Sequence, residues 1–465
     1  MNRLFIVSLG LLLSCHPPSS APIGDYYGRL EIDGFTYRLY LNLSQSSLTA
    51  VSLRGEEIPL DTLYFKNDSL HFSRADFYSE FNGYYDAEEG VISGNWISED
   101  RRVFPLIFVP VQSDTIVGFR PRATKEYTYQ LPPLENDDIE VCSLKEQQLR
   151  TGPLDSLVHA IIDGKYHYVH SLLVAKNNCL VLEEYFYGFK RKAHFGIQSA
   201  TKSFVSALTG IALGKGEINS AQASLCEYFP IHQDLICNEQ NKSITMDQVL
   251  SMTTGLAWDE ITYDYGHEKN TAEIAANQPD QFRYLLSQPK SEEKVFAYNS
   301  LNHLMMNHVL QKSTGLDNKR EMEERLLKPL GINSYDLGAV NNGIIGDIFL
   351  RPRDMLKFGL LYLNNGQWQG NQVVPSAWVK ESTTTKIQLA PGFGYAYFWW
   401  TKEFPWKGKT VDSYFAWGYG GQYIWIVPEL HLVVVFNGSN WSTDPAKYYF
   451  EIMEKYILPS CESLN

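Results

Sequence analysis

Residues 195–218 read FGIQSATKSFVSALTGIALGKGEI, and this stretch decides how the rest of the chain is interpreted. Small and apolar residues dominate it. Apolar residues recur at the spacing of one helix face, at Phe204, Val205, Leu208, Ile211 and Ala212. Because Gly214 and Gly216 follow this run, the pattern predicts a buried helix that ends there.

Ser199 and Lys202 lie three residues apart at the start of the predicted helix. This spacing places the two side chains one turn apart on the same face. A lysine in that position can take the proton that a serine loses when it attacks a carbonyl carbon. The same residues allow a second interpretation, in which Ser199 caps the helix and Lys202 extends to water. The segment alone favours neither.

The Ser-x-x-Lys spacing also occurs twice elsewhere, at Ser287 to Lys290 and at Ser291 to Lys294. Both copies lie in the sequence SQPKSEEK, where a proline and several charges are typical of a solvated loop. Ser199 and Lys202 are therefore the candidate nucleophile and base.

The composition of the chain predicts a globular protein. Its 465 residues are 44% hydrophobic and 20% charged, which favours two or three domains. The formal net charge of −13 argues against a nucleic-acid partner. The chain contains neither a Cys-x-x-Cys pair nor a His-Glu-x-x-His sequence, so we expect no zinc site and no other cofactor.

Residues 1–14 have the pattern of an export signal. Arg3 precedes an apolar run that is too short to span a membrane. The sequence LLS before Cys15 resembles the bacterial lipobox, which implies cleavage before Cys15 and a lipid on that cysteine. We therefore expect an exported lipoprotein of the cell envelope, held by its lipid alone, with residues 15–23 as a tether. An ordinary signal peptide cut nearby is the alternative.

Five further cysteines are available for disulfides: Cys142, Cys179, Cys226, Cys237 and Cys461. An exported chain meets oxidising conditions. Cys226 and Cys237 flank one short loop and form the best candidate pair. Because five is an odd number, at least one thiol is expected to remain.

Residues 24–112 alternate between apolar and polar side chains in the manner of strands. The sequence FTYRLYLNL at 35–43 is an example, and turn signals such as Asn67-Asp68 separate the runs. This pattern predicts a small antiparallel β barrel or sandwich that carries no chemistry. Prolines and polar residues at 113–140 predict a linker.

Residues 141–465 mix strands with helices. Strands are expected at 171–184, 414–427 and 431–437, which implies one sheet built from distant parts of the chain. The helices expected between and after them, besides the one that follows Ser199, are 245–252, 302–312, 319–327, 352–363 and 445–457.

Two further motifs follow the Ser199 segment in order. Tyr298-Asn299-Ser300 precedes an amphipathic helix, and Gly418-Tyr419-Gly420-Gly421 lies within a strand pair. With Ser199 and Lys202, this set resembles the serine beta-lactamase and penicillin-binding-protein superfamily. The resemblance is strongest to its class C beta-lactamase, DD-peptidase and family VIII esterase branch, and it covers residues 137–460.

The resemblance implies an α+β domain of the beta-lactamase/transpeptidase type, with an antiparallel sheet flanked by helices and a helical lobe. It also implies that Ser199 is the acylated nucleophile, that Lys202 is its base and that Tyr298 shuttles a proton. These three side chains would share protons as one coupled unit.

The third motif would contact the substrate. The resemblance implies that Gly418, Gly420 and Gly421 let a substrate carbonyl lie against the strand edge. The N–H groups of Ser199 and Gly421 would then form the oxyanion hole. A β-bulge or a tight bend is the alternative reading of these glycines.

Two departures from the family pattern narrow the expected substrate. Many members have lysine or histidine where this chain has Gly418, so a cation that would grip a substrate carboxylate is absent. Beta-lactams and D-alanyl peptides both carry that carboxylate, so they are less favoured. Ser300, which would contact the substrate, stands where asparagine is commoner. Tyr-x-Ser resembles the branch that hydrolyses esters and small linear amides, including aminohexanoate-oligomer hydrolases.

We therefore expect a serine hydrolase that cleaves an ester or amide in a small molecule or short peptide through an acyl-enzyme. One alternative is a non-catalytic or slowly acylated protein that binds envelope peptides. A metal-dependent hydrolase is a more distant alternative. The sequence indicates no oligomeric state.

Overall fold

A computed structural model of the protein describes residues 22, 24–32, 35–43, 46–50, 57–74, 79–98, 101–111, 121–122, 124–265, 267–340, 344–440 and 445–461. The chain forms two compact units, which divide between Phe119 and Arg120. The predicted export signal and Cys15 lie outside the described residues and stay predictions. Within the described residues, no helix has the length and apolar character needed to cross a membrane.

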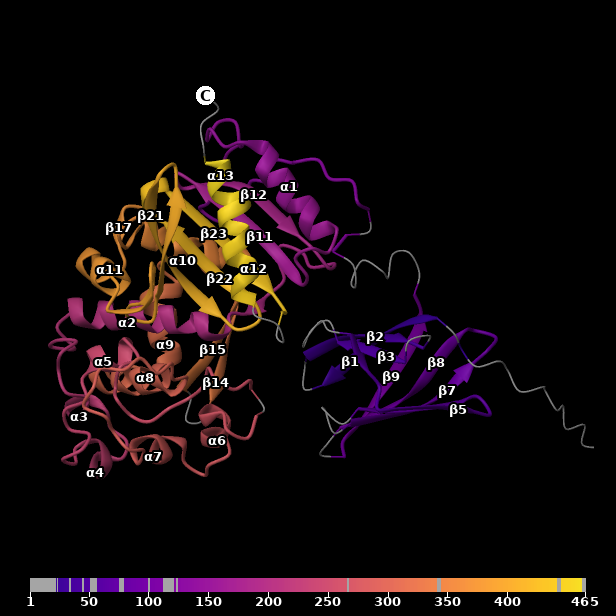
Figure 1. Cartoon of the computed structure of the whole chain (residues 1–465), viewed down its shortest axis with the longest axis horizontal. Coiled ribbons are helices and arrows are strands. Elements are labelled where there is room, and N and C mark those ends of the chain that lie inside the picture. Colours follow the sequence, from indigo (N-terminus) through magenta and orange to yellow (C-terminus); the bar gives the residue numbers. More distant parts are fainter. Residues whose placement is uncertain are drawn as a thin grey trace, which may run out of the picture. The chain divides into compact units, whose positions relative to one another are not determined.

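The first unit is a nine-stranded antiparallel sheet (Figure 1). Its strands lie in the order β4-β3-β2-β1-β9-β8-β7-β6-β5. The first strand along the chain, β1, therefore pairs with the last, β9. In its core Phe72 stacks on Phe81, and Phe108 meets both rings edge to face. The predicted amino-terminal β domain is confirmed. Its strands are β1 (Asp25–Ile32), β2 (Phe35–Asn42), β3 (Ser47–Ala50), β4 (Glu57–Pro59), β5 (Thr62–Lys66), β6 (Ser69–Arg74), β7 (Ser79–Asp86), β8 (Val91–Ile97) and β9 (Val103–Pro110).

The second unit is built on another nine-stranded sheet, in the order β10-β12-β11-β23-β22-β21-β20-β19-β18. Strands from the start of the unit lie beside strands from its end, as predicted. All neighbours are antiparallel except β10 and β12. The strands are β10 (Glu140–Val141), β11 (Val169–Lys176), β12 (Cys179–Tyr185), β18 (Ile387–Ala390), β19 (Phe393–Tyr395), β20 (Trp400–Trp406), β21 (Lys409–Gly418), β22 (Gln422–Val427) and β23 (Leu432–Gly438).

Helices cover both faces of this sheet. Neighbouring residues of a strand point to opposite faces. The Tyr423 ring lies 4.5 Å from Tyr449 of α12 (Pro445–Ile452). On the other face, a Cβ at Gly359 of α10 (Pro352–Leu363) would lie 2.9 Å from Ile424, so this glycine lets α10 lie close to the sheet.

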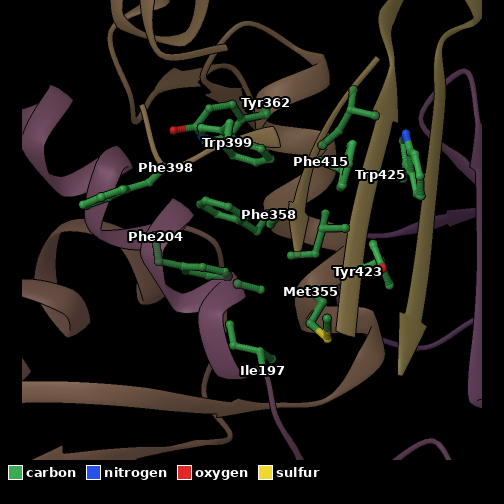
Figure 2. Close-up of a cluster of buried hydrophobic side chains, with 14 of the residues drawn as sticks. Ile197, Phe204, Met355, Phe358, Tyr362, Phe398, Trp399, Phe415, Tyr423 and Trp425 are labelled. Carbon is green, nitrogen blue, oxygen red and sulfur yellow. The ribbon is translucent and has the colours of Figure 1, made fainter. Parts of the chain in front are cut away.

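The core between α10 and the helix after Ser199 is aromatic. Figure 2 shows Phe204, Phe358 and Trp399 in line, with ring centroids 3.7 Å and then 5.9 Å apart. Phe204 belongs to α2 (Thr201–Gly214), which is buried along most of its length, as predicted. This packing fixes the start of α2, where Ser199 lies.

The remaining helices largely form a lobe beside α2 (Figure 1). The expected helices at 245–252 and 302–312 are α5 (Met246–Leu250) and α8 (Leu301–Thr314). The expected helix at 319–327 divides into α9 (Asn318–Met322) and a π-helical turn, Glu323–Leu327, and the last helix likewise continues from α12 into Met453–Ile457. Other elements of the unit include α1 (Thr151–Ile162), α3 (Leu225–Tyr228), α4 (Gln233–Ile236), α6 (Thr271–Ala276), α7 (Gln281–Leu286), α11 (Ser376–Thr383), α13 (Leu458–Ser460), β13 (Phe195–Gly196), β14 (Tyr335–Val340) and β15 (Ile344–Leu350).

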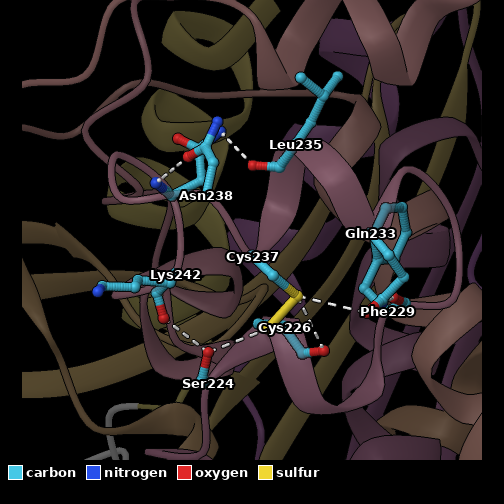
Figure 3. Close-up of a disulfide and its surroundings, with 9 residues drawn as sticks. Ser224, Cys226, Phe229, Gln233, Leu235, Cys237, Asn238 and Lys242 are labelled. Carbon is cyan, nitrogen blue, oxygen red and sulfur yellow. Dashed lines mark hydrogen bonds between the residues drawn. A yellow bond between two sulfur atoms is a disulfide. The ribbon is translucent and has the colours of Figure 1, made fainter.

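Two disulfides close loops of the second unit. Cys226 of α3 is joined to Cys237 after α4 (Figure 3), which is the pair that the sequence favoured. Cys142 is joined to Cys179, a pair that the sequence did not indicate. Cys461 belongs to neither, and its Sγ lies 3.7 Å from the Ile457 carbonyl oxygen.

The segment before β10 is bonded to the second unit. Arg122 and Tyr127 both donate to Glu184 of β12. The buried Arg353 donates to Glu183 and to the Pro133 carbonyl. The second unit therefore includes described residues that we had placed in a linker ending at residue 140.

Candidate active site

Ser199 and Lys202 are hydrogen-bonded to each other. Ser199 lies in a short 3₁₀ turn, Gln198–Ala200, directly before α2, and the Lys202 Nζ donates to its Oγ at 2.9 Å. The Lys202 residue is only 2% exposed. The N-cap residue of α2 is Ala200, without a side-chain cap. The alternative in which Ser199 caps the helix and Lys202 extends to water is therefore wrong.

A half-buried carboxyl group holds the turn that carries Ser199. The Asp347 Oδ1 accepts hydrogen bonds from the Gln198 N–H at 2.8 Å and from the Thr201 hydroxyl at 3.2 Å. Burial raises the pKa of Asp347 to about 6, and the charge of Lys202 acts against that rise. Gln198 has a φ of 53°, in the left-handed region, so these bonds compensate for an unfavourable backbone conformation. The sequence did not indicate this role of Asp347.

Tyr298 joins the same site. The Lys202 Nζ lies 5.0 Å from the centroid of the Tyr298 ring, and the ring stacks on Trp400 at 5.7 Å. Ser199 and Tyr298 line one cavity of about 500 Å³. The structure thus brings together the three predicted catalytic residues from separate segments of the chain.

Ser300 is bonded to a carboxylate that the sequence analysis did not identify. Its N–H donates to the Glu260 Oε2 at 2.7 Å, and its hydroxyl donates to the Glu260 Oε1. Trp258 and Tyr265 donate to the same carboxylate at 3.0 and 2.6 Å. We call Glu260, Trp258, Tyr265 and Ser300 the Glu260 cluster. Ser300 also lines the cavity that contains Ser199 and Lys202, so its substrate contact stays a prediction beside this positioning role.

His303 lies between the Glu260 cluster and Lys202. Its Nδ1 is 2.7 Å from the Ser300 carbonyl oxygen, and its Nε2 is 3.2 Å from that of Gly346. Burial, aided by the positive charge of Lys202, lowers the pKa of His303 to about 3. A neutral imidazole has one N–H to donate, so His303 supports the backbone at Ser300 rather than carrying a charge.

Gly418 ends β21 where that strand meets the Ser199 segment. A Cβ at this position would lie 2.0 Å from the Ile197 carbonyl oxygen, so backbone packing requires glycine here. The absence of a lysine or histidine at Gly418 thus has a steric cause.

The next glycines form a tight turn. Gly420 and Gly421 have φ values of 82° and 101°, and the Gly421 N–H donates to the Gly418 carbonyl at 3.3 Å. The role of Gly421 as an oxyanion donor stays a prediction: its N–H makes a long bond of 3.3 Å inside the turn. Tyr419 is the residue of this motif that lines the cleft beside Ser199.

Among the residues that the structure describes, no group of three or more His, Cys, Asp or Glu side chains is placed to hold a metal ion.

Comparisons with known proteins agree on one family. A protein-family model described as Beta-lactamase matches residues 167–452. The 6-aminohexanoate-dimer hydrolase of Paenarthrobacter ureafaciens is 21% identical over 322 residues, which are 63% of this chain and 78% of that protein.

Solved structures with the same fold include a Bacillus anthracis protein assigned as a 6-aminohexanoate-dimer hydrolase. It is 20% identical, with a TM-score of 0.54 over 69% of this chain and 84% of that one. A family VIII carboxylesterase is 13% identical, with a TM-score of 0.51 over 72% of this chain and all of that one (100%). At these identities the likeness shows a common fold.

Proposed function

Since this chain belongs to the beta-lactamase family, we propose that its second unit is a serine hydrolase that cleaves an ester or an amide through an acyl-enzyme on Ser199. The observation that carries the proposal is the 2.9 Å hydrogen bond between the Ser199 Oγ and a lysine that is 2% exposed. A nucleophile and its base are expected to lie within such a distance. A similar protein is named a 6-aminohexanoate-dimer hydrolase, and a protein of the same fold is named a family VIII carboxylesterase.

The proposed reaction begins when the Ser199 Oγ attacks the substrate carbonyl carbon. Lys202 first gives up a proton to solvent, and its amine then takes the hydroxyl proton of Ser199. The tetrahedral intermediate then expels an alcohol or an amine, which takes up a proton. Tyr298, whose ring lies 5.0 Å from the Lys202 Nζ, is proposed to carry protons between the lysine and the leaving group. A water molecule then hydrolyses the acyl-enzyme by the same proton transfers in reverse.

The negative oxygen of the intermediate needs donors beside Ser199. We propose the N–H of Ser199 itself as one, because it lies at the amino-terminal end of α2, where the helix dipole favours negative charge. The turn after β21 is proposed to supply the other, at Gly421, as the resemblance implies. One such donor contributes about 3–4 kcal/mol to the transition state.

A serine-directed fluorophosphonate tests the nucleophile directly. We expect the wild-type protein to be labelled once per chain and the Ser199→Ala variant to remain unlabelled. Ser287→Ala is the matched control, because Ser287 starts another Ser-x-x-Lys sequence, and it should label like wild type. Labelling that persists in Ser199→Ala would overturn the proposal. Labelling without turnover of any ester or amide would favour the alternative binding role.

The export of this protein remains a separate proposal. We propose that Cys15 carries a lipid and that the second unit works in an oxidising compartment of the cell envelope. The two disulfides support this, because such bonds persist outside the reducing cytosol. Mass spectrometry of the amino-terminal peptide tests it: an unmodified Met1 on the membrane-free protein from the native cell would contradict it.

A further inference from the structure

Ser199 lies between two cavities. The first, of about 500 Å³, and the second, of about 630 Å³, share Ser199, Tyr265 and Tyr419 in their linings. The Tyr265 and Tyr419 rings meet edge to face at 5.2 Å, and both residues are partly exposed. This tyrosine pair therefore forms the boundary between the cavities, with the nucleophile accessible from both.

The first cavity, which we call the aromatic compartment, has walls made mostly of rings. Trp400 is central: its ring lies 5.7 Å from Tyr298, 5.5 Å from Phe393 and 5.1 Å from Trp417. Stacked rings hold one another in place, so this wall presents a rigid apolar surface. Neither lysine nor arginine occurs among the described residues that line it, and its charged groups are Glu260 and Asp264.

The second cavity, which we call the polar compartment, has a different chemistry. Amide, hydroxyl and imidazole side chains line it together with apolar ones such as Leu301, Leu304 and Phe349, and Glu273 and Asp347 are its acidic residues. Its cation among the described residues is Lys202, which already donates to Ser199. A substrate carboxylate would therefore meet two carboxyl groups and no separate cation, whereas an ammonium or a neutral polar group would find acceptors.

Resting on the proposed hydrolase activity, we infer that the substrate is an amphiphilic ester or amide: an apolar aromatic or aliphatic group fills the aromatic compartment, and a neutral polar or cationic group fills the polar one. The scissile carbonyl lies between them at Ser199. The substrate carries no carboxylate next to the scissile bond. This differs from the preference inferred from Gly418 alone, because it rests on the residues that line the cleft.

A matched series of synthetic esters tests the inference. Esters of 3-phenylpropanoic acid with 3,3-dimethylbutanol, choline and 3-hydroxypropanoate carry a neutral, a cationic and an anionic group on the same acyl chain. Phenylethyl esters of acids that carry the same neutral, cationic and anionic groups place the phenyl ring on the alcohol side instead. In the preferred orientation, we expect kcat/KM for the anionic ester to be at least about tenfold below both others, because like charges repel. Replacing the phenylpropanoyl group by acetyl should cost about tenfold as well.

Two variants assign these preferences to the compartments. Trp400→Ala should lower kcat/KM for the aromatic esters about tenfold more than for the acetyl esters, because any effect through Tyr298 is common to both series. Trp406→Ala, on the same strand and outside both cavities, is its control. Glu273→Lys should raise kcat/KM for the anionic ester about fivefold relative to that for the neutral ester. Glu268→Lys, at an exposed position, should leave this ratio unchanged.

The possible failures are distinct. If Ser199 is not labelled and no ester is hydrolysed, the proposed hydrolase itself is wrong. If the esters are hydrolysed and the anionic one is as good as the others in both orientations, the hydrolase stands and the substrate class inferred from the two compartments is overturned. Unchanged selectivity in both Trp400→Ala and Glu273→Lys would overturn it too.

Discussion

The cleft contains two neighbouring groups of polar side chains, which differ in how many hydrogen bonds their central residue makes. The reacting cluster consists of Ser199, Lys202 and Tyr298, and the Lys202 Nζ makes one hydrogen bond among the described residues, to Ser199. In the Glu260 cluster, one buried carboxylate accepts four hydrogen bonds. A site that moves protons keeps few competing partners for its reactive atoms, whereas the group that positions it is satisfied throughout.

The first prediction removes the base from the reacting cluster. Lys202→Met keeps the length of the side chain and cannot take a proton, so kcat/KM for an activated ester should fall by about 10³- to 10⁴-fold. Lys357→Met is the matched control: Lys357 is equally buried and donates to the Gly331 carbonyl outside the cleft. It should lower the melting temperature and leave kcat/KM unchanged. Equal rates in both variants would contradict the role of Lys202.

The second prediction weakens the Glu260 cluster while keeping its shape. In Glu260→Gln, one acceptor oxygen becomes an NH₂ group that faces hydrogen-bond donors, so Ser300 and Tyr265 lose their fixed positions. We expect kcat/KM to fall by about 10- to 100-fold and fluorophosphonate labelling of Ser199 to slow, with the fold intact. Circular dichroism and labelling kinetics together measure both effects.

Glu321→Gln provides the control for this substitution. Glu321 is also fully buried, on α9, and burial raises its pKa to about 7, so the neutral amide suits its surroundings. Its substitution should leave labelling and kcat/KM unchanged. A Glu260→Gln variant that behaved like Glu321→Gln would show that four hydrogen bonds on one carboxylate do not matter to the reaction.

The third prediction concerns His303, which touches the Glu260 cluster and is opposed by the charge of Lys202. Its pKa is about 3 in the folded state and 6.5 in the unfolded state. Between these values the unfolded chain binds more protons, so the free energy of unfolding rises with pH by at most about 1.4 kcal/mol per pH unit. This stability is present above pH 6.5 and is lost as the pH falls toward 3.

His303→Gln should remove that contribution. Urea unfolding at several pH values between 4.5 and 7 should give a shallower pH dependence than wild type. Asp347, whose pKa is raised to about 6, acts in the opposite direction between its unfolded value of 3.8 and 6, and it is present in both proteins. The difference between the two proteins therefore isolates His303, and parallel curves would contradict a neutral imidazole.

The smallest effect on activity is expected far from both clusters. Replacing Cys226 and Cys237 together by serine opens the loop of the helical lobe and should lower the free energy of unfolding by about 3 kcal/mol. Both clusters lie outside this loop, so kcat/KM should stay within about twofold of wild type. Cys461→Ser, which opens no disulfide, is the control. A large loss of kcat/KM in the double variant would mean that the lobe and the clusters are coupled.

The reacting cluster was predictable because its pattern is local. Ser199 and Lys202 are one helical turn apart, so their contact follows from the helix alone. The sheet was predictable for a related reason: apolar strand patterns at both ends of the domain had to pair with something, and β11 lies beside β23. The prediction of Tyr298 also depended on the order of the three motifs along the chain.

The Glu260 cluster could not be predicted in the same way. Glu260 and Ser300 are forty residues apart, and neither position shows that the two side chains share one buried site. The same holds for Cys142 and Cys179, which come together because β10 pairs with β12. The conformation of the turn at Gly420 and Gly421 could not be predicted either, because glycine leaves the φ angles open in the sequence.

The close approach of Gly418 to the Ile197 carbonyl limits how this member of the beta-lactamase family can change. Every substitution at residue 418 would place a Cβ 2.0 Å from the Ile197 carbonyl oxygen, so we expect no substitution to be tolerated there. Trp417 and Tyr419 flank it, and both line the cleft. New substrate preferences in descendants of this protein should therefore arise from changes at 417 and 419, around a fixed glycine, and a saturation library of the three positions would recover variants at the outer two alone.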